Sequence, residues 1–262
     1  MDDEPHVLTR REGAVGVMTF NRPKSLNTLD LPMVDAMEAA LELLERDPEV
    51  RAIVVTGCDD RTFIAGGNIR DLGSRRGLAH YGEFATRLHH VFRRFETCPK
   101  PIVAAVNGWA LGGGCEFLLT TDLRLMADDA QLGLPEIKLG LFPGGGGSQR
   151  LMRQIPLCRA KMMMFTGDFM TAHEAERIGL VNRAVPRAEL MPQAMALATR
   201  LAASSPWALR LLKGSMLHGA EMPLDAALAH EQATISLVLD SDDAHEGCDA
   251  FLAKRPPAFR GR

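Results

Sequence analysis

Two glutamates in this chain stand beside glycine-rich or apolar segments, where a carboxyl group can exchange protons. Glu116 follows three consecutive glycines at the predicted start of a helix. Glu136 stands after a predicted strand, within the apolar segment 133–137. Burial among apolar groups raises the pKa of a carboxyl group and makes it a better proton donor near neutral pH. Taken alone, each glutamate is more often a solvated or capping residue, and spacing leaves open whether the two meet.

The glycine run before Glu116 leaves backbone N–H groups unobstructed by side chains. It leads into a predicted helix start, where the partial positive charge of the helix terminus favours an anionic oxygen. Such a backbone can bind the carbonyl oxygen of an acyl group as an oxyanion hole. Residues 62–70, which follow another predicted strand, are the candidate for a second N–H donor. The alternative is a tight turn with close packing, which is the commoner use of clustered glycines.

Several other catalytic patterns are absent from the sequence. No segment matches the phosphate-binding pattern G-x-x-x-x-G-K-[ST], and Phe117 occupies the last glycine position of G-x-G-x-x-G. There is no G-x-S-x-G nucleophile elbow and no H-E-x-x-H metal motif. The five cysteines are odd in number and none forms C-x-x-C, so neither a disulfide framework nor a zinc site is expected. We expect no metal and no redox cofactor.

Length and composition set further bounds. The chain has 262 residues, 46% of them hydrophobic, so it can bury a sizeable core as one large domain, with or without a smaller appendage. The formal net charge of −3 argues against a broad nucleic-acid-binding surface. No apolar run approaches the length of a membrane span, and the acidic start is unlike a secretory signal. We therefore expect a cytoplasmic protein without nucleic-acid or membrane partners.

Strand and helix patterns alternate in the first part of the chain, which predicts an α/β fold of crossover units or stacked turns. Asp30 and Pro32 mark the start of a helix whose apolar residues recur at helical spacing. Another helix is expected over residues 81–95. Strands are expected at 15–20, 50–56, 102–106 and 123–126, and later helices at 171–178, 192–203, 207–218 and 223–239. A helical layer therefore forms the last part of the chain.

Several short motifs occur in one order, and in that order the chain resembles the crotonase superfamily, the enoyl-CoA hydratase/isomerase family, over nearly its whole length. The motifs are NRPKSLN (21–27), FIAGGNI (63–69), KPIVAAVNG (100–108), ALGGGCE (110–116), LPEIKLGLFPG (134–144), GSQRL (147–151), AERIGLV (175–181) and FLAKRP (251–256). Any single motif is a weak signal. Their ordered set outweighs the interpretation of the glycines as a mere tight turn.

The resemblance implies a spiral of repeated β-β-α turns over residues 1–200 and a helical region over 201–262 that mediates trimerisation, with trimers usually paired into hexamers. It also implies hydration of 2-enoyl-CoA thioesters to 3-hydroxyacyl-CoA, with no cofactor beyond the coenzyme A of the substrate. By the same resemblance, the backbone N–H groups of Gly67 and Gly113 would hold the thioester carbonyl. Glu116 would act mainly as base toward water, and Glu136 would deliver a proton to the α-carbon.

The resemblance also implies which residues bind the substrate and its coenzyme A. Lys24 and Arg70 would lie near the CoA moiety, and Lys254 would reach the ligand of a neighbouring subunit. Solvated surface charges are the alternative for Lys24 and Lys254. The complete set of binding candidates is Lys24, Leu26, Ala65, Asn68, Ile69, Arg70, Trp109, Leu111, Pro135, Gly144, Phe251 and Lys254.

Three features depart from the common pattern of this family. Asn68 replaces an aspartate that is common in hydratases. Trp109 stands where smaller residues are frequent and would narrow the acyl pocket. Residues 144–147 form a smooth glycine loop that would leave room for a bulky acyl group. Isomerisation of a double bond or other thioester-enolate chemistry is the alternative activity. A non-catalytic or RNA-binding relative is a further alternative, disfavoured by the two glutamates and the acidic net charge.

Overall fold

The protein is described by a computed structural model of residues 4–78 and 80–262; the first three residues of the acidic start lie outside the described residues. Its larger sheet has the strand order β1-β2-β3-β5-β7-β10, in which β1 is antiparallel to β2 and the other pairs are parallel. The strands are β1 (Val7–Glu12), β2 (Val15–Phe20), β3 (Ala52–Gly57), β5 (Ile102–Val106), β7 (Leu123–Ala127) and β10 (Arg183–Val185). Strands β3 and β5 are buried apolar runs, as expected for parallel strands covered on both faces.

A smaller sheet has the order β4-β6-β8-β9. It contains β4 (Thr62–Ile64), β6 (Trp109–Leu111), β8 (Gln131–Gly133) and β9 (Met170–Thr171). Along the chain, β3 is followed by β4, β5 by β6 and β7 by β8, so each turn adds one strand to each sheet. This alternation confirms the predicted spiral of β-β-α turns.

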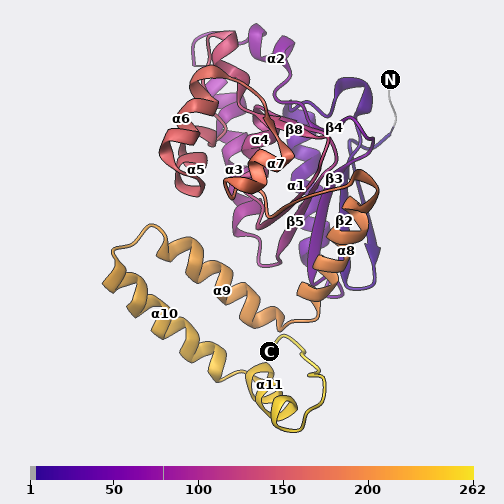
Figure 1. Ribbon diagram of the computed structural model, residues 1–262, viewed down its shortest axis with the longest axis vertical. Helices are drawn as coiled ribbons and strands as arrows, with labels where there is room; N and C mark the ends of the chain where they lie inside the picture. The colour runs from indigo at the N-terminus through magenta and orange to yellow at the C-terminus, as the bar shows by residue number, and fades with distance from the viewer. Residues whose placement is uncertain (1–3, 79) are drawn as a thin grey trace.

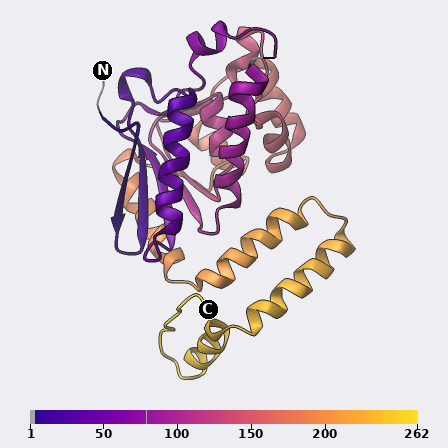
Figure 2. The same cartoon turned by 180° about the vertical axis from the view of Figure 1, so that it is seen from behind.

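Helices cover the large sheet on both faces (Figures 1 and 2). Helix α1 (Leu31–Arg46) packs against β1 and against α3 (Thr86–Thr97), whereas α8 (Arg187–Ala202) packs on β3, β5 and β7. The remaining short helices are η1 (Pro23–Ser25), α2 (Ile69–Ser74), η2 (His80–Ala85), α4 (Gly113–Leu118), η3 (Pro135–Leu139), α5 (Gly147–Gln154), α6 (Leu157–Thr166) and α7 (Ala172–Arg177). No helix within residues 4–78 and 80–262 is long and apolar enough to cross a membrane.

Helix α1 begins where its sequence predicts. The Asp30 carboxylate accepts the N–H of Met33 at 3.0 Å, and Pro32 lies in the first turn, where its missing N–H costs nothing. Met37 and Leu41 follow at helical spacing and are fully buried against the sheet. The N-cap and the apolar stripe therefore act together to set both the start and the orientation of this helix.

An aromatic cluster fixes the short helix α4 in the core. The ring of Phe117 lies 4.8 Å from that of Phe95, 5.5 Å from Phe20, 5.6 Å from Phe92 and 6.1 Å from Phe63, measured between centroids. These rings come from three strands or helices besides α4, and edge-to-face pairs add to the energy of burial. Because Phe117 follows Glu116 directly, this cluster also holds the backbone that carries Glu116.

The C-terminal helices form an arm beside the spiral (Figure 1). Helix α9 (Pro206–Gly219) packs against α10 (Leu224–Leu239), and α11 (Asp242–Leu252) follows near the start of α9. Many apolar side chains on the arm are exposed: Leu212, Met216, Leu224, Leu228, Ile235, Leu237, Leu239, Phe251 and Leu252. So many exposed apolar side chains on three consecutive helices are unusual on a monomer and are typical of an interface.

Two predicted helices differ from the observed ones. Helix α8 begins at Arg187 rather than at residue 192, and Pro192 lies inside it. Its residues Leu190, Ala194, Ala198 and Ala202 are buried at intervals of four, so packing on the sheet offsets the hydrogen bond that Pro192 removes. The helix expected over 81–95 is divided into the wider helical turn η2 and the regular helix α3.

Candidate active site

The backbone N–H groups of Gly67 and Gly113 lie side by side. Strands β4 and β6 pair in parallel, so the loops that follow them leave the small sheet at the same edge. A Cβ placed on Gly113 would lie 3.7 Å from the nitrogen of Gly67. Neither N–H has a backbone acceptor among the described residues. Two donors without a backbone acceptor therefore lie close together, as the two donors of an oxyanion hole do.

Gly112 turns the chain into α4 just before this pair. It is the N-cap of α4 with φ of 51°, a left-handed conformation that a side chain disfavours. A Cβ on Gly112 would also lie 3.1 Å from the Glu136 Oε1 atom. Glycine at this position thus serves two needs, the turn into the helix and the approach of Glu136 to the Gly67–Gly113 pair.

The carboxyl group of Glu116 is held by a distant loop. The side chain is 4% exposed, and its Oε1 accepts the N–H groups of Gly145 at 2.7 Å and Gly147 at 2.8 Å. Burial raises the pKa of Glu116, against the opposing effects of these two N–H groups and of Arg150. The two hydrogen bonds fix the position of the carboxylate and leave its second oxygen, Oε2, without a hydrogen-bond donor among the described residues.

Glu136 lies on η3 and lines the same cavity as Glu116. Its Oε2 atom is buried and has no hydrogen-bond partner among the described residues. Burial, followed by the charge of Glu116, raises the pKa of Glu136 to about 7. A buried carboxyl oxygen without a hydrogen-bond partner is costly in a folded protein unless a ligand or water forms a hydrogen bond with it. A pKa near 7 suits a group that both gives and takes protons.

All four predicted catalytic residues line one cavity of about 550 Å³. Of the predicted binding residues, Ala65, Ile69, Pro135 and Gly144 also line it. Apart from Arg75 and His80, much of the remaining wall is apolar or aromatic, formed by Leu72, Tyr81, Phe84, Leu88, Leu139, Leu141 and Phe142. The shape and lining are those of a pocket for an apolar chain that ends at a polar reaction centre.

The other predicted binding residues do not line this cavity: Lys24, Leu26, Asn68, Arg70, Trp109, Leu111, Phe251 and Lys254. Leu26 nonetheless touches the site through its backbone, because its carbonyl accepts the N–H of Ala65 at 3.1 Å. The Asn68 side chain caps α2 by accepting the N–H groups of Arg70 and Asp71. Lys24 on η1 and Lys254 after α11 are exposed.

One expectation about the pocket needs correction. Trp109 lies on β6, is 38% exposed and is not part of the cavity wall, so it does not narrow the acyl pocket of this chain. Gly144 and Gly145 line the cavity, so the expectation of room for a bulky acyl group stays a prediction, while Gly145 and Gly147 also lie against Glu116. A Cβ on Gly145 would lie 2.6 Å from Glu116 Oε2, and one on Gly147 would lie 2.9 Å from Oε1.

Sequence reasoning missed Asn27, which supports the oxyanion loop. The side chain is fully buried, and its Nδ2 donates to the carbonyls of Thr62 and Phe63 at 3.2 and 3.0 Å. Its Oδ1 accepts the N–H of Arg22 at 2.7 Å. Asn27 has φ of 53°, which asparagine tolerates better than most residues. The available signal was its place at the end of the first motif, NRPKSLN.

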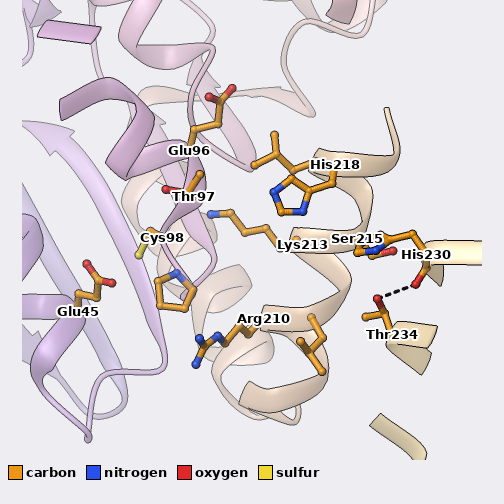
Figure 3. Close-up of a pocket in the computed structure, with 14 residues that line it drawn as sticks. Glu45, Glu96, Thr97, Cys98, Arg210, Lys213, Ser215, His218, His230 and Thr234 are labelled. Atoms are coloured by element: carbon orange, nitrogen blue, oxygen red, sulfur yellow. Dashed lines mark hydrogen bonds between the residues drawn. The ribbon is translucent and has the colours of Figure 1, made fainter. Parts of the chain in front are cut away.

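A second cavity of about 480 Å³ lies between the end of α3 and the α9–α10 arm (Figure 3). Its wall includes Glu96, Thr97, Lys213, His218 and His230. Lys213 Nζ pairs with Asp122 Oδ2 at 2.7 Å, and the two histidine rings stand 6.0 Å apart. No predicted catalytic or binding residue lines this cavity. It is the space between the spiral and its C-terminal arm, remote from the glutamate pair.

Comparison with known proteins shows the family to which this chain belongs. The family model described as enoyl-CoA hydratase/isomerase matches residues 10–262. The chain therefore belongs to the enoyl-CoA hydratase/isomerase family, which confirms the resemblance found in the sequence and identifies the chain as an enzyme of the crotonase fold.

Individual relatives are similar over nearly their whole length. The chain is 38% identical over 250 residues to the short-chain-enoyl-CoA hydratase of Clostridium acetobutylicum, covering 95% of each chain. It is 36% identical to the 2,3-dehydroadipyl-CoA hydratase of Escherichia coli, covering 98% of this chain and 99% of that one. The solved enoyl-CoA hydratase of Bacillus anthracis superposes with a TM-score of 0.94 at 31% identity, covering 98% and 100% of the two chains.

Proposed function

We propose that the protein hydrates 2-enoyl-CoA thioesters to 3-hydroxyacyl-CoA. The observation that carries the proposal is the meeting of the buried carboxyl of Glu116, the half-buried carboxyl of Glu136 and two free backbone N–H groups at one cavity. The hydratase names of the relatives support the same reaction. We also propose that the chain divides near residue 200 into the spiral and the C-terminal helical region. A cytoplasmic location is proposed as well, and the five free cysteines support it.

In the proposed mechanism the N–H groups of Gly67 and Gly113 bind the thioester carbonyl oxygen. As water adds to the β-carbon, negative charge develops on that oxygen, and each fixed donor contributes roughly 10²–10³ in rate by analogy with other oxyanion holes. Glu116, aligned by two N–H groups, takes the proton from water through its remaining oxygen. Glu136, whose pKa is about 7, is protonated in a large fraction of molecules at neutral pH, and this form delivers a proton to the α-carbon.

Coenzyme A would lie at the mouth of the cavity. Ala65, Ile69 and Pro135 line the cavity beside the N–H pair and would contact the thioester end, with Asn68 and Leu111 in the adjoining backbone. Lys24 and Arg70 are the cations proposed for the polyanionic end of the ligand, next to Leu26. Phe251 in α11 and Lys254 just after it do not line the cavity of their own chain and would serve the ligand of a neighbouring subunit.

The test is an assay with crotonyl-CoA that follows the loss of conjugated-enoyl absorbance. The wild type should be active, whereas Glu116→Gln and Glu136→Gln should each lower kcat by at least roughly 10²-fold, because each removes a positioned proton-transfer group. An exposed glutamate far from the site, changed in Glu49→Gln, provides the control. The proposal is wrong if the wild type leaves a panel of 2-enoyl-CoA substrates untouched.

Isomerisation of a 3-enoyl-CoA is the second candidate. The unpartnered Oε2 of Glu136 favours it, because one carboxyl with a pKa of about 7 can move a proton between two carbons. In that case Glu136→Gln abolishes activity while Glu116→Gln retains most of it, and a 3-enoyl-CoA reacts where 2-enoyl-CoA does not. A protein that ignores thioesters and retards RNA in a gel would instead support the non-catalytic alternative.

We also propose that the chain forms trimers that pair into hexamers, with the C-terminal arm as the contact surface. The exposed apolar residues of α9 and α10 and the open space beneath the arm support this assembly (Figure 3). Sedimentation velocity should give a particle of three or six chains. Leu224→Glu with Leu228→Glu should dissociate it, whereas Leu43→Glu, at a similarly exposed site on α1, should not.

A further inference from the structure

His89 lies behind the loop that holds Glu116. It belongs to α3, is exposed, and its Nε2 stands 2.8 Å from the carbonyl oxygen of Gly144. A carbonyl oxygen has no hydrogen to donate, so Nε2 carries the proton and donates it. The neighbouring His90 points elsewhere on the same helix, with its Nε2 3.2 Å from Glu38 Oε1.

The Gly144 carbonyl and the Gly145 N–H belong to one peptide unit. That unit is planar and trans, so its C=O and N–H point in opposite directions. One end accepts from His89, and the other donates to Glu116 Oε1 at 2.7 Å. Hydrogen bonds in such a chain polarise one another, by about 10–30% per bond in condensed phase. The donor on the carbonyl therefore strengthens the N–H that reaches Glu116.

The second N–H that reaches Glu116 is supported by main chain instead. Gly147 donates to Oε1 at 2.8 Å, and the carbonyl of the same peptide unit, on Gly146, accepts the N–H of Arg150 at 2.8 Å within the first turn of α5. Between the two units, Arg150 Nη1 donates to the Gly145 carbonyl at 3.3 Å. Of the two peptide units that contact Glu116, the one at 144–145 is thus the unit whose carbonyl is held by a side chain, His89.

We propose that His89 is a positioning residue, which acts through the 144–145 peptide unit to align the Glu116 carboxylate and stabilise its charge. The inference rests on the proposed role of Glu116 as the base. The other charged groups packed around this relay are Arg150 on α5, Glu136 on η3, and Glu96 on α3, which pairs with Arg150 at 3.0 Å. Arg93, one helical turn after His89, is paired with Glu96.

The kinetic test compares His89→Phe, which lacks the donor, with His89→Gln, whose amide nitrogen can replace Nε2. His89→Phe should lower kcat about 3–10-fold with little change in KM, because one exposed hydrogen bond is worth that much. It should also move the acid limb of the kcat profile to higher pH, since the Glu116 carboxylate loses stabilisation. His89→Gln should restore both, and His90→Phe should behave as the wild type. In a Glu116→Gln background His89→Phe should have no further effect.

A spectroscopic readout separates this inference from the proposed reaction. In protein labelled with ¹⁵N-glycine, the amide proton of Gly145 should shift upfield in His89→Phe and return in His89→Gln, while the Gly147 amide keeps its shift as the internal control. An unchanged Gly145 amide and an unchanged pH profile in His89→Phe overturn the relay. Glu116→Gln that stays fully active overturns the proposed function instead, whatever the Gly145 amide shows.

Discussion

Gly147 and Glu116 are joined by a hydrogen bond of 2.8 Å that bridges 31 residues of sequence, from the N–H of one to Oε1 of the other. A Cβ on Gly147 would lie 2.9 Å from both Oε1 and Cγ of Glu116 and 3.0 Å from Pro143 Cβ. The loop can therefore approach the carboxylate closely because this residue has no side chain. The position of a proposed catalytic group is thus set by a residue from another helix.

Gly147→Ala should displace Glu116 and lower kcat on the order of 10²-fold, because a shift of about 1 Å at a reacting group has that effect. Stopped-flow hydration of crotonyl-CoA measures the change. Gly73→Ala on α2, where a Cβ meets nothing within 4 Å, is the matched control and should keep wild-type kcat. Full activity in Gly147→Ala would show that the bond to Glu116 is dispensable.

Glu136→Gln should stabilise the protein at alkaline pH. The carboxyl ionises near 4.5 in an unfolded chain and at about 7 in the folded protein. Between these values the folded state binds more protons, so stability is lost as pH rises from 4.5 through about 7. Since the group is partly solvated, the cost at pH 8 is discounted to about 1–3 kcal/mol.

Urea unfolding at two pH values checks this prediction. At pH 8 the free energy of unfolding of Glu136→Gln should exceed that of the wild type, and at pH 4.5 the difference should vanish. Glu49→Gln, at an exposed position, should show no such change with pH. A Glu136→Gln protein that gains nothing at pH 8 would mean that the carboxyl is solvated rather than buried.

Asn27→Ala should destabilise the protein by roughly 2–4 kcal/mol, because it leaves buried backbone groups unsatisfied and puts alanine at a φ of 53°. Activity should fall as well, since the segment that leads to Gly67 loses an anchor at the carbonyl of Phe63. Chemical denaturation measures the first effect and kcat the second. Asn21→Ala, which removes an exposed bond to the Pro5 carbonyl, should change neither.

Asp243→Ala should release the C-terminal tail. The buried carboxylate of Asp243 accepts the N–H groups of Arg260 at 2.6 Å and Gly261 at 2.9 Å, and the hydroxyl of Ser205 at 2.6 Å. Hydrogen exchange at the amides of Arg260 and Gly261 should accelerate strongly, because charge-assisted bonds of this kind are lost together. Asp242→Ala removes an exposed pair with Arg262 and should leave both amides protected.

Much of the local structure follows from the sequence because its causes are local. Asp30 and Pro32 define the start of α1 through capping and helix-start preferences, and the apolar spacing after them defines its buried face. Proline is where this reasoning was weakest. Pro192 predicted a helix start, but α8 begins at Arg187, because burial of Leu190 and Ala194 on the sheet outweighs the lost hydrogen bond.

The ordered motifs likewise identified the family and the spiral of β-β-α turns, and they predicted Gly67, Gly113, Glu116 and Glu136 as catalytic, since such inferences depend on residue type and order. Only the tertiary structure decided which of them meet. Parallel pairing of β4 with β6 sets the Gly67 and Gly113 amides side by side. Approach of the loop before α5 fixes Glu116 and brings the Gly144 carbonyl to His89, whereas Trp109 on β6 stays outside the pocket. Such contacts depend on distances in space between residues tens of positions apart, and no local pattern of residue types records those distances.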